Sequence, residues 1–86
     1  MTMKIKIVEA ISTNLGMNSS AKKLFDVLNN SSEQDIHIDF TGAIFMSRSF
    51  TQEYLFQKMN SKKHIVEENL PLDISKMFRV VAKDFE

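Results

Sequence analysis

The chain has 86 residues, of which 43% are hydrophobic, and its eleven basic residues are balanced by eleven acidic ones. This length gives room for one small hydrophobic core, so we expect a single domain over residues 1–86. A neutral chain without cysteine has no overall field to attract nucleic acid, no disulfide, no reactive thiol and no cysteine zinc site.

The first predicted element is a strand over residues 3–7, where apolar residues alternate with two lysines. These lysines would discourage pairing with another chain if the strand borders the sheet. A helix follows, because Ser19 and Ser20 offer acceptors for the free amides of a helix start and apolar residues then recur at helical spacing as far as Leu28.

A second strand is predicted over residues 36–40, where apolar residues alternate with His37 and Asp39. We expect His37 on the less buried face of this strand and Asp39 bonded to amides in the turn beyond it. The next helix is predicted to begin near Ser49, because Ser49 and Gln52 have the spacing of a capping box.

A third, weaker strand is predicted over residues 64–66, and a last helix runs from Pro71 to Phe85. The order strand, helix, strand, helix, strand, helix is typical of an α/β fold in which right-handed connections join the strands. We therefore expect a small, largely parallel sheet covered by helices.

Three apolar residues, Ile44, Phe45 and Met46, crowd the turn before the second helix. They cannot easily all turn inward, so at least one of them is a candidate for contact with a partner. We expect Phe45 to pack in the core. Met46 is balanced between core and contact, and it is favoured for contact because methionine adapts to varied surfaces.

The sequence IDF at 38–40, the apolar turn through Phe45 and Met46, and SFTQEYL at 49–55 together resemble the STAS-like domains of unknown function. In that family the helix begins with Ser-Phe, two further residues, an acidic residue and a leucine. The matching positions here are Asp39, Ser49, Phe50 and Glu53. The closing segment IVEENLPLDISKMFRVV is similar to the last strand and helix of STAS domains, so the resemblance implies a STAS-like βαβαβα domain.

STAS domains proper include anti-sigma-factor antagonists, which bind an ATP-binding kinase and release it when a serine at this helix start is phosphorylated. Laid over their pattern, FMSRSF places Ser47 at the usual aspartate, Arg48 at the usual phosphoacceptor, Ser49 at the second serine and Phe50 at the usual glycine. The resemblance implies a GHKL-type ATPase or kinase as the partner, with Ser47 or Ser49 as a shifted phosphoacceptor.

The residues themselves support such a switch in part. A phosphate at a helix N-terminus meets unpaired amides and the positive end of the helix dipole, and Arg48 could pair with it. Capping alone also explains Ser49. Ser47 either satisfies the turn backbone or contacts a partner.

Other classes of function find less support in the sequence. His37 and Asp39 share a strand face, but no nucleophile elbow or oxyanion loop surrounds a nearby serine, so we do not expect an enzyme. His37, His64 and the scattered carboxylates form no metal-ligand pattern, so no metal or cofactor is expected. The basic cluster near Lys62 is typical of a solvated helix end, so we expect no nucleic-acid partner.

No apolar run reaches the roughly 20 residues of a transmembrane helix, so we expect a cytoplasmic protein without a membrane partner. Our leading hypothesis is a non-catalytic regulatory module that binds a protein partner and can also form a homodimer. The alternative is a small-ligand-binding domain with a pocket at the carboxyl ends of the strands. The candidate partner-binding residues are Asp39, Met46, Ser47, Arg48, Ser49 and Glu53.

Overall fold

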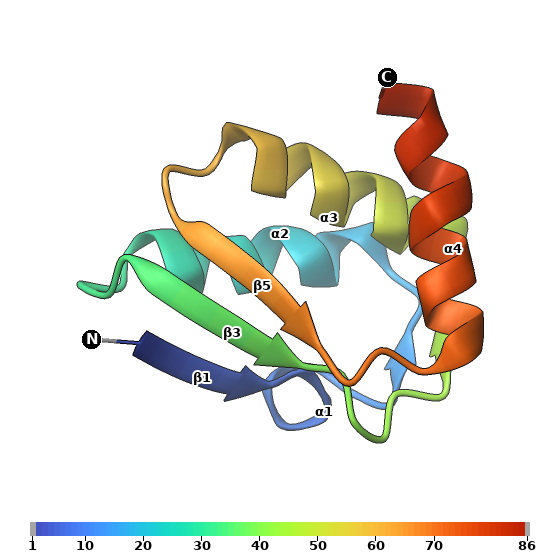
Figure 1. Ribbon diagram of the computed structural model, residues 1–86, viewed down its shortest axis with the longest axis horizontal. Coiled ribbons are helices and arrows are strands. Elements are labelled where there is room, and N and C mark those ends of the chain that lie inside the picture. The colour runs from blue at the N-terminus through green and yellow to red at the C-terminus, as the bar shows by residue number, and fades with distance from the viewer. Residues whose placement is uncertain (1, 86) are drawn as a thin grey trace.

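Three parallel strands form the main sheet in the computed structural model, which describes residues 2–85 (Figure 1). Strand β1 (Thr2–Lys6) pairs with β3 (Asp35–Asp39), and β3 pairs with β5 (His64–Glu68). The first two lie where the alternating pattern of the sequence predicted strands, and β5 lies at the weaker strand expected over residues 64–66. The predicted α/β fold with a parallel sheet is confirmed.

Three long helices connect or follow the strands. They are α2 (Asn18–Asn29), α3 (Arg48–Asn60) and α4 (Leu72–Ala82), and a short 3-10 turn, η1 (Lys83–Phe85), extends α4. The structure adds three short elements that the sequence did not predict, α1 (Ile7–Ala10), β2 (Asn14–Leu15) and β4 (Phe45–Met46). Segments of two to four residues are too short to show a period of two or of 3.6 in the sequence.

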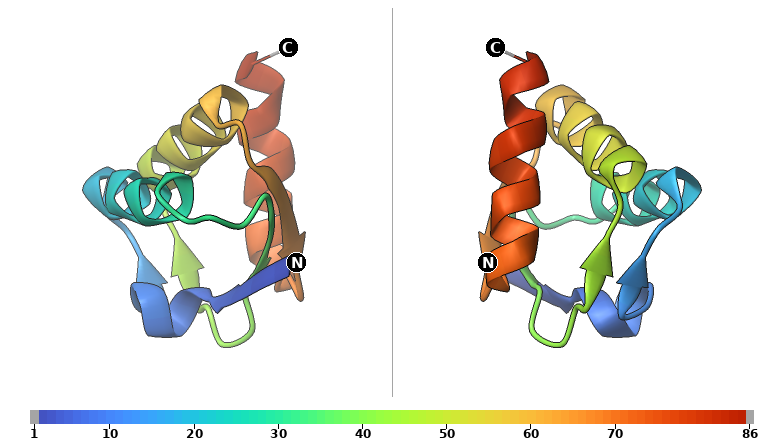
Figure 2. Two further views of the ribbon diagram at one scale, coloured as in Figure 1. Left: turned by 90° about the vertical axis from the view of Figure 1, so that its left-hand side faces the viewer. Right: turned by 90° about the vertical axis from the view of Figure 1, so that its right-hand side faces the viewer.

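The helices cover only one face of the sheet. The strands lie side by side in the order in which they follow one another in the chain, β1, β3, β5. Both connections therefore move across the sheet in the same direction, and right-handed crossovers of this kind place their helices on the same face. Figure 1 looks onto the uncovered face, and Figure 2 shows α2 and α3 together on the opposite side. Helix α4 packs against α3 and β4 near the end of the sheet.

Tyr54 of α3 lies at the centre of the core beneath this sheet. Its side chain is fully buried, with ring centroids 5.2 Å from Phe25, 6.2 Å from Phe40 and 5.3 Å from Phe78. The Tyr54 hydroxyl donates a 2.7 Å hydrogen bond to Glu67 of β5. Burial and the nearby Glu67 carboxylate raise the pKa of Tyr54 well above its usual value.

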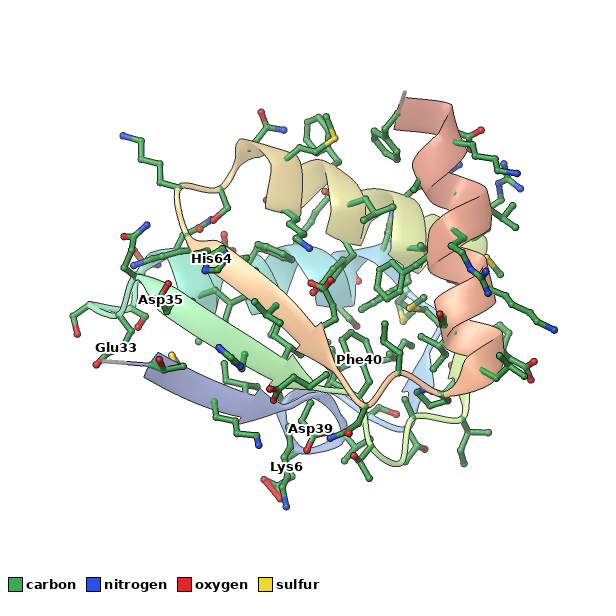
Figure 3. All side chains as sticks on the ribbon, in the orientation of Figure 1. Lys6, Glu33, Asp35, Asp39, Phe40 and His64 are labelled. Carbon is green, nitrogen blue, oxygen red and sulfur yellow. The ribbon has the colours of Figure 1, made fainter. Side chains whose placement is uncertain are left out.

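The uncovered face of the sheet carries polar side chains. His37 Nδ1 lies 2.9 Å from Glu68 Oε2, and Lys4 Nζ lies 3.6 Å from Glu68 Oε1. The contact with His37 holds the pKa of Glu68 below its usual value. Figure 3 shows a second pair, His64 and Asp35, whose side chains lie 3.1 Å apart at the other end of the same face. The expected position of His37 on the less buried face is confirmed.

Candidate functional site

Two strand-to-helix junctions lie side by side because β2 and β4 pair with each other. The pairing is parallel, with Leu15 opposite Met46, and α2 follows β2 just as α3 follows β4. The backbone amide of Ser47 donates a 3.0 Å hydrogen bond to the carbonyl of Leu15, which fixes one junction against the other. Helices α2 and α3 therefore begin next to each other and run in the same direction (Figure 1).

Ser47 caps helix α3. Its backbone is extended, as is usual for an N-cap residue. Its Oγ accepts a 3.0 Å hydrogen bond from the Phe50 amide and so satisfies one of the free donors of the first turn. The same Oγ donates a 2.9 Å hydrogen bond to the carbonyl of Gly16. The helix begins at Arg48, one residue from the predicted start near Ser49, but the prediction that Ser49 caps it is wrong, because the hydroxyl that accepts the Phe50 amide is that of Ser47.

Ser49 lies in the first turn of α3 with an exposed side chain. Its Oγ is 3.2 Å from the Ser47 Oγ, so its one hydrogen bond is to a neighbouring hydroxyl. The roles predicted for the two serines are exchanged, since Ser47 has the structural contacts and Ser49 presents its hydroxyl at the surface.

Arg48 joins the start of α3 to the end of the chain. Its guanidinium donates a 2.9 Å hydrogen bond to Asp84 Oδ2 in η1, and the two side chains are 57% and 47% exposed. Solvent therefore reaches both partners, and the ion pair is available for exchange with another charged group. This pair could not be predicted from the sequence, because 36 residues separate its partners.

Glu53 lies one turn beyond Ser49 on the same side of α3. Its Oε2 accepts a 2.8 Å hydrogen bond from Gln57. A shallow pocket of about 330 Å³ brings it together with Ser49 and with Asp84, the partner of Arg48. The complete lining is Asn18, Ser49, Gln52, Glu53, Phe56, Asp84 and Phe85. The structure thus brings Ser49 and Glu53 together beside Asp84, which bonds Arg48, and the role of these residues in partner binding stays a prediction.

An apolar pocket of about 370 Å³ continues from this one along α3. It is lined by Leu55, Lys58, Met59, Ala82 and Phe85, so Phe85 belongs to both pockets. We call the two together the α3–η1 groove. Phe56 and Met59 are 54% and 64% exposed beside it. Phe56 was not among the residues predicted to form the site, although it falls two residues after Tyr54 and hence on the opposite side of the helix, which is the signal that could have identified it.

Asp39 lies away from this groove, at the carboxyl end of β3. Only 7% of the residue is exposed, and its Oδ1 accepts hydrogen bonds from the Thr41 hydroxyl at 2.6 Å, the Thr41 amide at 2.9 Å and Asn69 at 3.1 Å. The Thr41 hydrogen bonds, with that of Asn69, lower the pKa of Asp39 from 3.8 to about 2. The expectation that Asp39 bonds the turn beyond the strand is confirmed, and all three hydrogen bonds use one oxygen, Oδ1, of this candidate for partner binding.

The structure reverses the roles predicted for Phe45 and Met46. Met46 is 3% exposed and belongs to the core, whereas Phe45 is 49% exposed and Ile44 is 78% exposed. The cause is the pairing of β4, which turns Met46 inward together with its partner Leu15 and so turns Phe45 outward by alternation. The apolar surface of the turn is therefore formed by Ile44 and Phe45.

Comparison with known protein families, with curated proteins and with solved structures finds no match for this chain. The STAS-like resemblance of residues 38–55 stays a prediction. Within residues 2–85, no helix combines the length and apolar character needed to cross a membrane. The same part of the chain holds no group of three or more histidine and acidic side chains able to bind a metal ion.

Proposed function

We propose that this chain is a non-catalytic, cytoplasmic STAS-like regulatory module that binds a protein partner through the β4–α3 junction. The observation that carries the proposal is the exposed apolar pair Ile44 and Phe45, beside the start of α3 that bears Arg48 and Ser49. Two adjacent apolar side chains on a turn favour burial against another surface, because removing apolar area from water is favourable.

The partner we propose is an ATP-binding ATPase or kinase of the GHKL type. This choice rests on the resemblance of residues 38–55 to STAS-like domains. The exposed Arg48–Asp84 pair supports it in one respect, because a charged side chain of a partner could exchange with either member at small cost.

Phosphorylation of Ser49 is the form of regulation that fits the contacts best. The Ser49 hydroxyl is exposed in the first turn of a thirteen-residue helix, where the dipole favours a negative charge. A phosphate there would repel Asp84 across the shared pocket and compete with it for Arg48. Ser47 is the poorer acceptor, because its hydroxyl is engaged in capping α3 and bonding Gly16.

The experiment is a calorimetric titration of the chain into the ATP-binding protein encoded beside its gene. We expect the double variant Ile44→Ser/Phe45→Ser to weaken binding at least about tenfold, as loss of an apolar anchor does. Val80→Ser is the matched control, because Val80 is an apolar residue of α4 that is 51% exposed, and its loss should leave the affinity unchanged. Equal effects of the two changes, or no complex with the unmodified chain, would contradict the proposal.

Phosphorylation is tested in the same mixture after addition of ATP, by intact-protein mass spectrometry. We expect one added phosphate, which Ser49→Ala abolishes and Ser47→Ala retains in the folded protein. A phosphate that persists in the Ser49→Ala variant contradicts the assignment of the acceptor and leaves the binding result to be judged separately.

A further inference from the structure

The outer edge of β1 has no strand beside it within residues 2–85, because β1 pairs only with β3. An edge of this kind presents unpaired backbone amides and carbonyls, which can accept an added strand. The edge lies at the opposite end of the strand order from β5 and shares no residue with the α3–η1 groove (Figure 1).

Two pockets follow this edge on the side of the sheet that the helices cover. One, of about 250 Å³, lies between Ile5 of β1 and Leu24 and Val27 of α2. The other, of about 610 Å³, lies between Met3 of β1 and Val27. Val27 is 59% exposed and lines both, so the two pockets adjoin at this side chain, and we call them together the β1–α2 groove.

The two pockets lie beside alternate residues of β1, one beside Ile5 and the other beside Met3. Met3 and Ile5 are two residues apart and point to the same face, so the positions they mark along β1 are about 6.6 Å apart. A strand added to β1 would place every second side chain over the groove at the same interval. Recognition by strand addition combines these two elements, since backbone hydrogen bonds at the edge give affinity and pockets for alternate side chains give specificity.

The opposite face of β1 specifies the charge of the added strand. Lys4 and Lys6 both project from the uncovered face, and the Lys4 side chain is 62% exposed. A second copy of this chain is a poor occupant, because antiparallel pairings of two β1 strands centred on Lys4 or on Ile5 place lysine opposite lysine. A strand with acidic residues at these positions would instead pair each lysine with an opposite charge.

We infer that the β1–α2 groove binds an extended segment of a partner protein in which acidic residues alternate with apolar ones. The segment adds to the sheet beside β1, with its apolar side chains in the groove and its acidic side chains opposite Lys4 and Lys6. This interaction is independent of the β4–α3 junction, so the chain can hold two partners, or two parts of one partner, at the same time.

The probe is a capped heptapeptide of alternating valine and glutamate, titrated into the full chain with amide chemical shifts as the readout. We expect saturable shifts in β1 and on the Val27 side of α2, and affinity at least about tenfold higher than for the corresponding valine–lysine peptide. In the Lys4→Gln/Lys6→Gln variant the two peptides should bind about equally. Shifts centred on other elements, or equal affinities for the two peptides in the unmodified chain, would overturn the inference.

Backbone methylation distinguishes strand addition from simple charge attraction. Two versions of the valine–glutamate peptide carry N-methyl groups on alternate residues, one set on the edge that faces β1 and the other on the opposite edge. We expect one version to lose binding and the other to retain it, because only one set of amides pairs with β1. Equal behaviour of the two versions contradicts an added strand.

The groove itself is tested by Val27→Asp, with Val80→Asp as the matched control on α4, since both side chains are more than half exposed in the folded chain. We expect Val27→Asp to weaken peptide binding at least about tenfold and Val80→Asp to leave it unchanged. Sedimentation of the unmodified chain completes the test. A dimer that Val27→Asp dissociates would show that a second copy occupies the groove, which overturns the proposed occupant.

Discussion

Ser47 Oγ lies 2.9 Å from the carbonyl oxygen of Gly16, and this hydrogen bond joins the cap of α3 to the segment that precedes α2. The Ser47 hydroxyl thus adds to the backbone pairing that joins the two helix starts, and it also accepts a hydrogen bond from the Phe50 amide. The candidate surface around Ser49 depends on this bond, because it fixes how the first turn of α3 is presented.

Replacing Ser47 by alanine should destabilise the fold. The change removes an N-cap and the partner of the Gly16 carbonyl, so we expect a loss of about 1 to 2 kcal/mol in the free energy of unfolding. Ser49→Ala is the control and should change stability by less than about 0.5 kcal/mol. Urea unfolding followed by circular dichroism measures both, and equal losses for the two serines would show that Ser47 is not the cap.

The only tyrosine of the chain should resist ionisation. Tyr54 is fully buried against Glu67, and its pKa is raised well above 10.0, so its ultraviolet absorbance should show no phenolate at the pH where a free tyrosine titrates. The pKa of Tyr54 is higher in the folded protein than in the unfolded chain, so the stability that comes from burying the neutral tyrosine is fully present below pH 10. It is lost as the pH rises through the folded pKa. Glu67→Gln, which removes the neighbouring charge, should bring the phenolate signal to lower pH.

Asp39 should titrate well below an ordinary aspartate. Its pKa is about 2 in the folded protein against 3.8 unperturbed, so its stabilising effect is present above pH 4 and is lost as the pH falls toward 2. Carbon-detected NMR of the carboxyl groups measures this value directly. Thr41→Val removes the hydroxyl that donates the shortest of the three hydrogen bonds and should raise the pKa, whereas a pKa unchanged by that substitution would contradict the assigned cause.

The Arg48–Asp84 pair should matter little for stability. Both side chains are about half exposed, so we expect Asp84→Asn to cost no more than about 1 kcal/mol, and less at high salt. The same substitution should strengthen the pairing of a phosphate on Ser49 with Arg48, because Asp84 then no longer competes for the guanidinium. Thermal unfolding of the variant at low and high salt tests the first statement, and a loss that salt does not reduce would show that the pair is more than an exposed contact.

The sequence predicted most of the long elements from several repeats of their period, whereas the strand near His64 was predicted from its place between two helices. Residues 36–40 alternate over a whole strand, and the structure has β3 at Asp35–Asp39. The two-residue strands β2 and β4 exist only because they pair with each other across the fold, which no local pattern records. That pairing decided the outcome for Phe45 and Met46.

The contacts of the candidate site residues could not be predicted from the sequence, and their role in partner binding stays a prediction. Ser49 and Glu53 lie together beside Asp84, which bonds Arg48, yet the choice between two nearby serines as the cap depended on Gly16, 31 residues away from Ser47. Asp84 and Phe85 complete the pocket from the end of the chain. Contacts between segments this distant in sequence are set by how the elements pack, and the spacing of residues within one segment does not contain them.

The uncovered face of the sheet gives the protein two internal reporters. Both histidines of the chain, His37 and His64, lie on that face, each beside a carboxylate. Their imidazole proton resonances can be followed by NMR without any label. A partner that covers the face changes both signals, whereas one that docks at the start of α3 leaves them in place, so the spectrum of the unmodified protein tells the two modes of assembly apart.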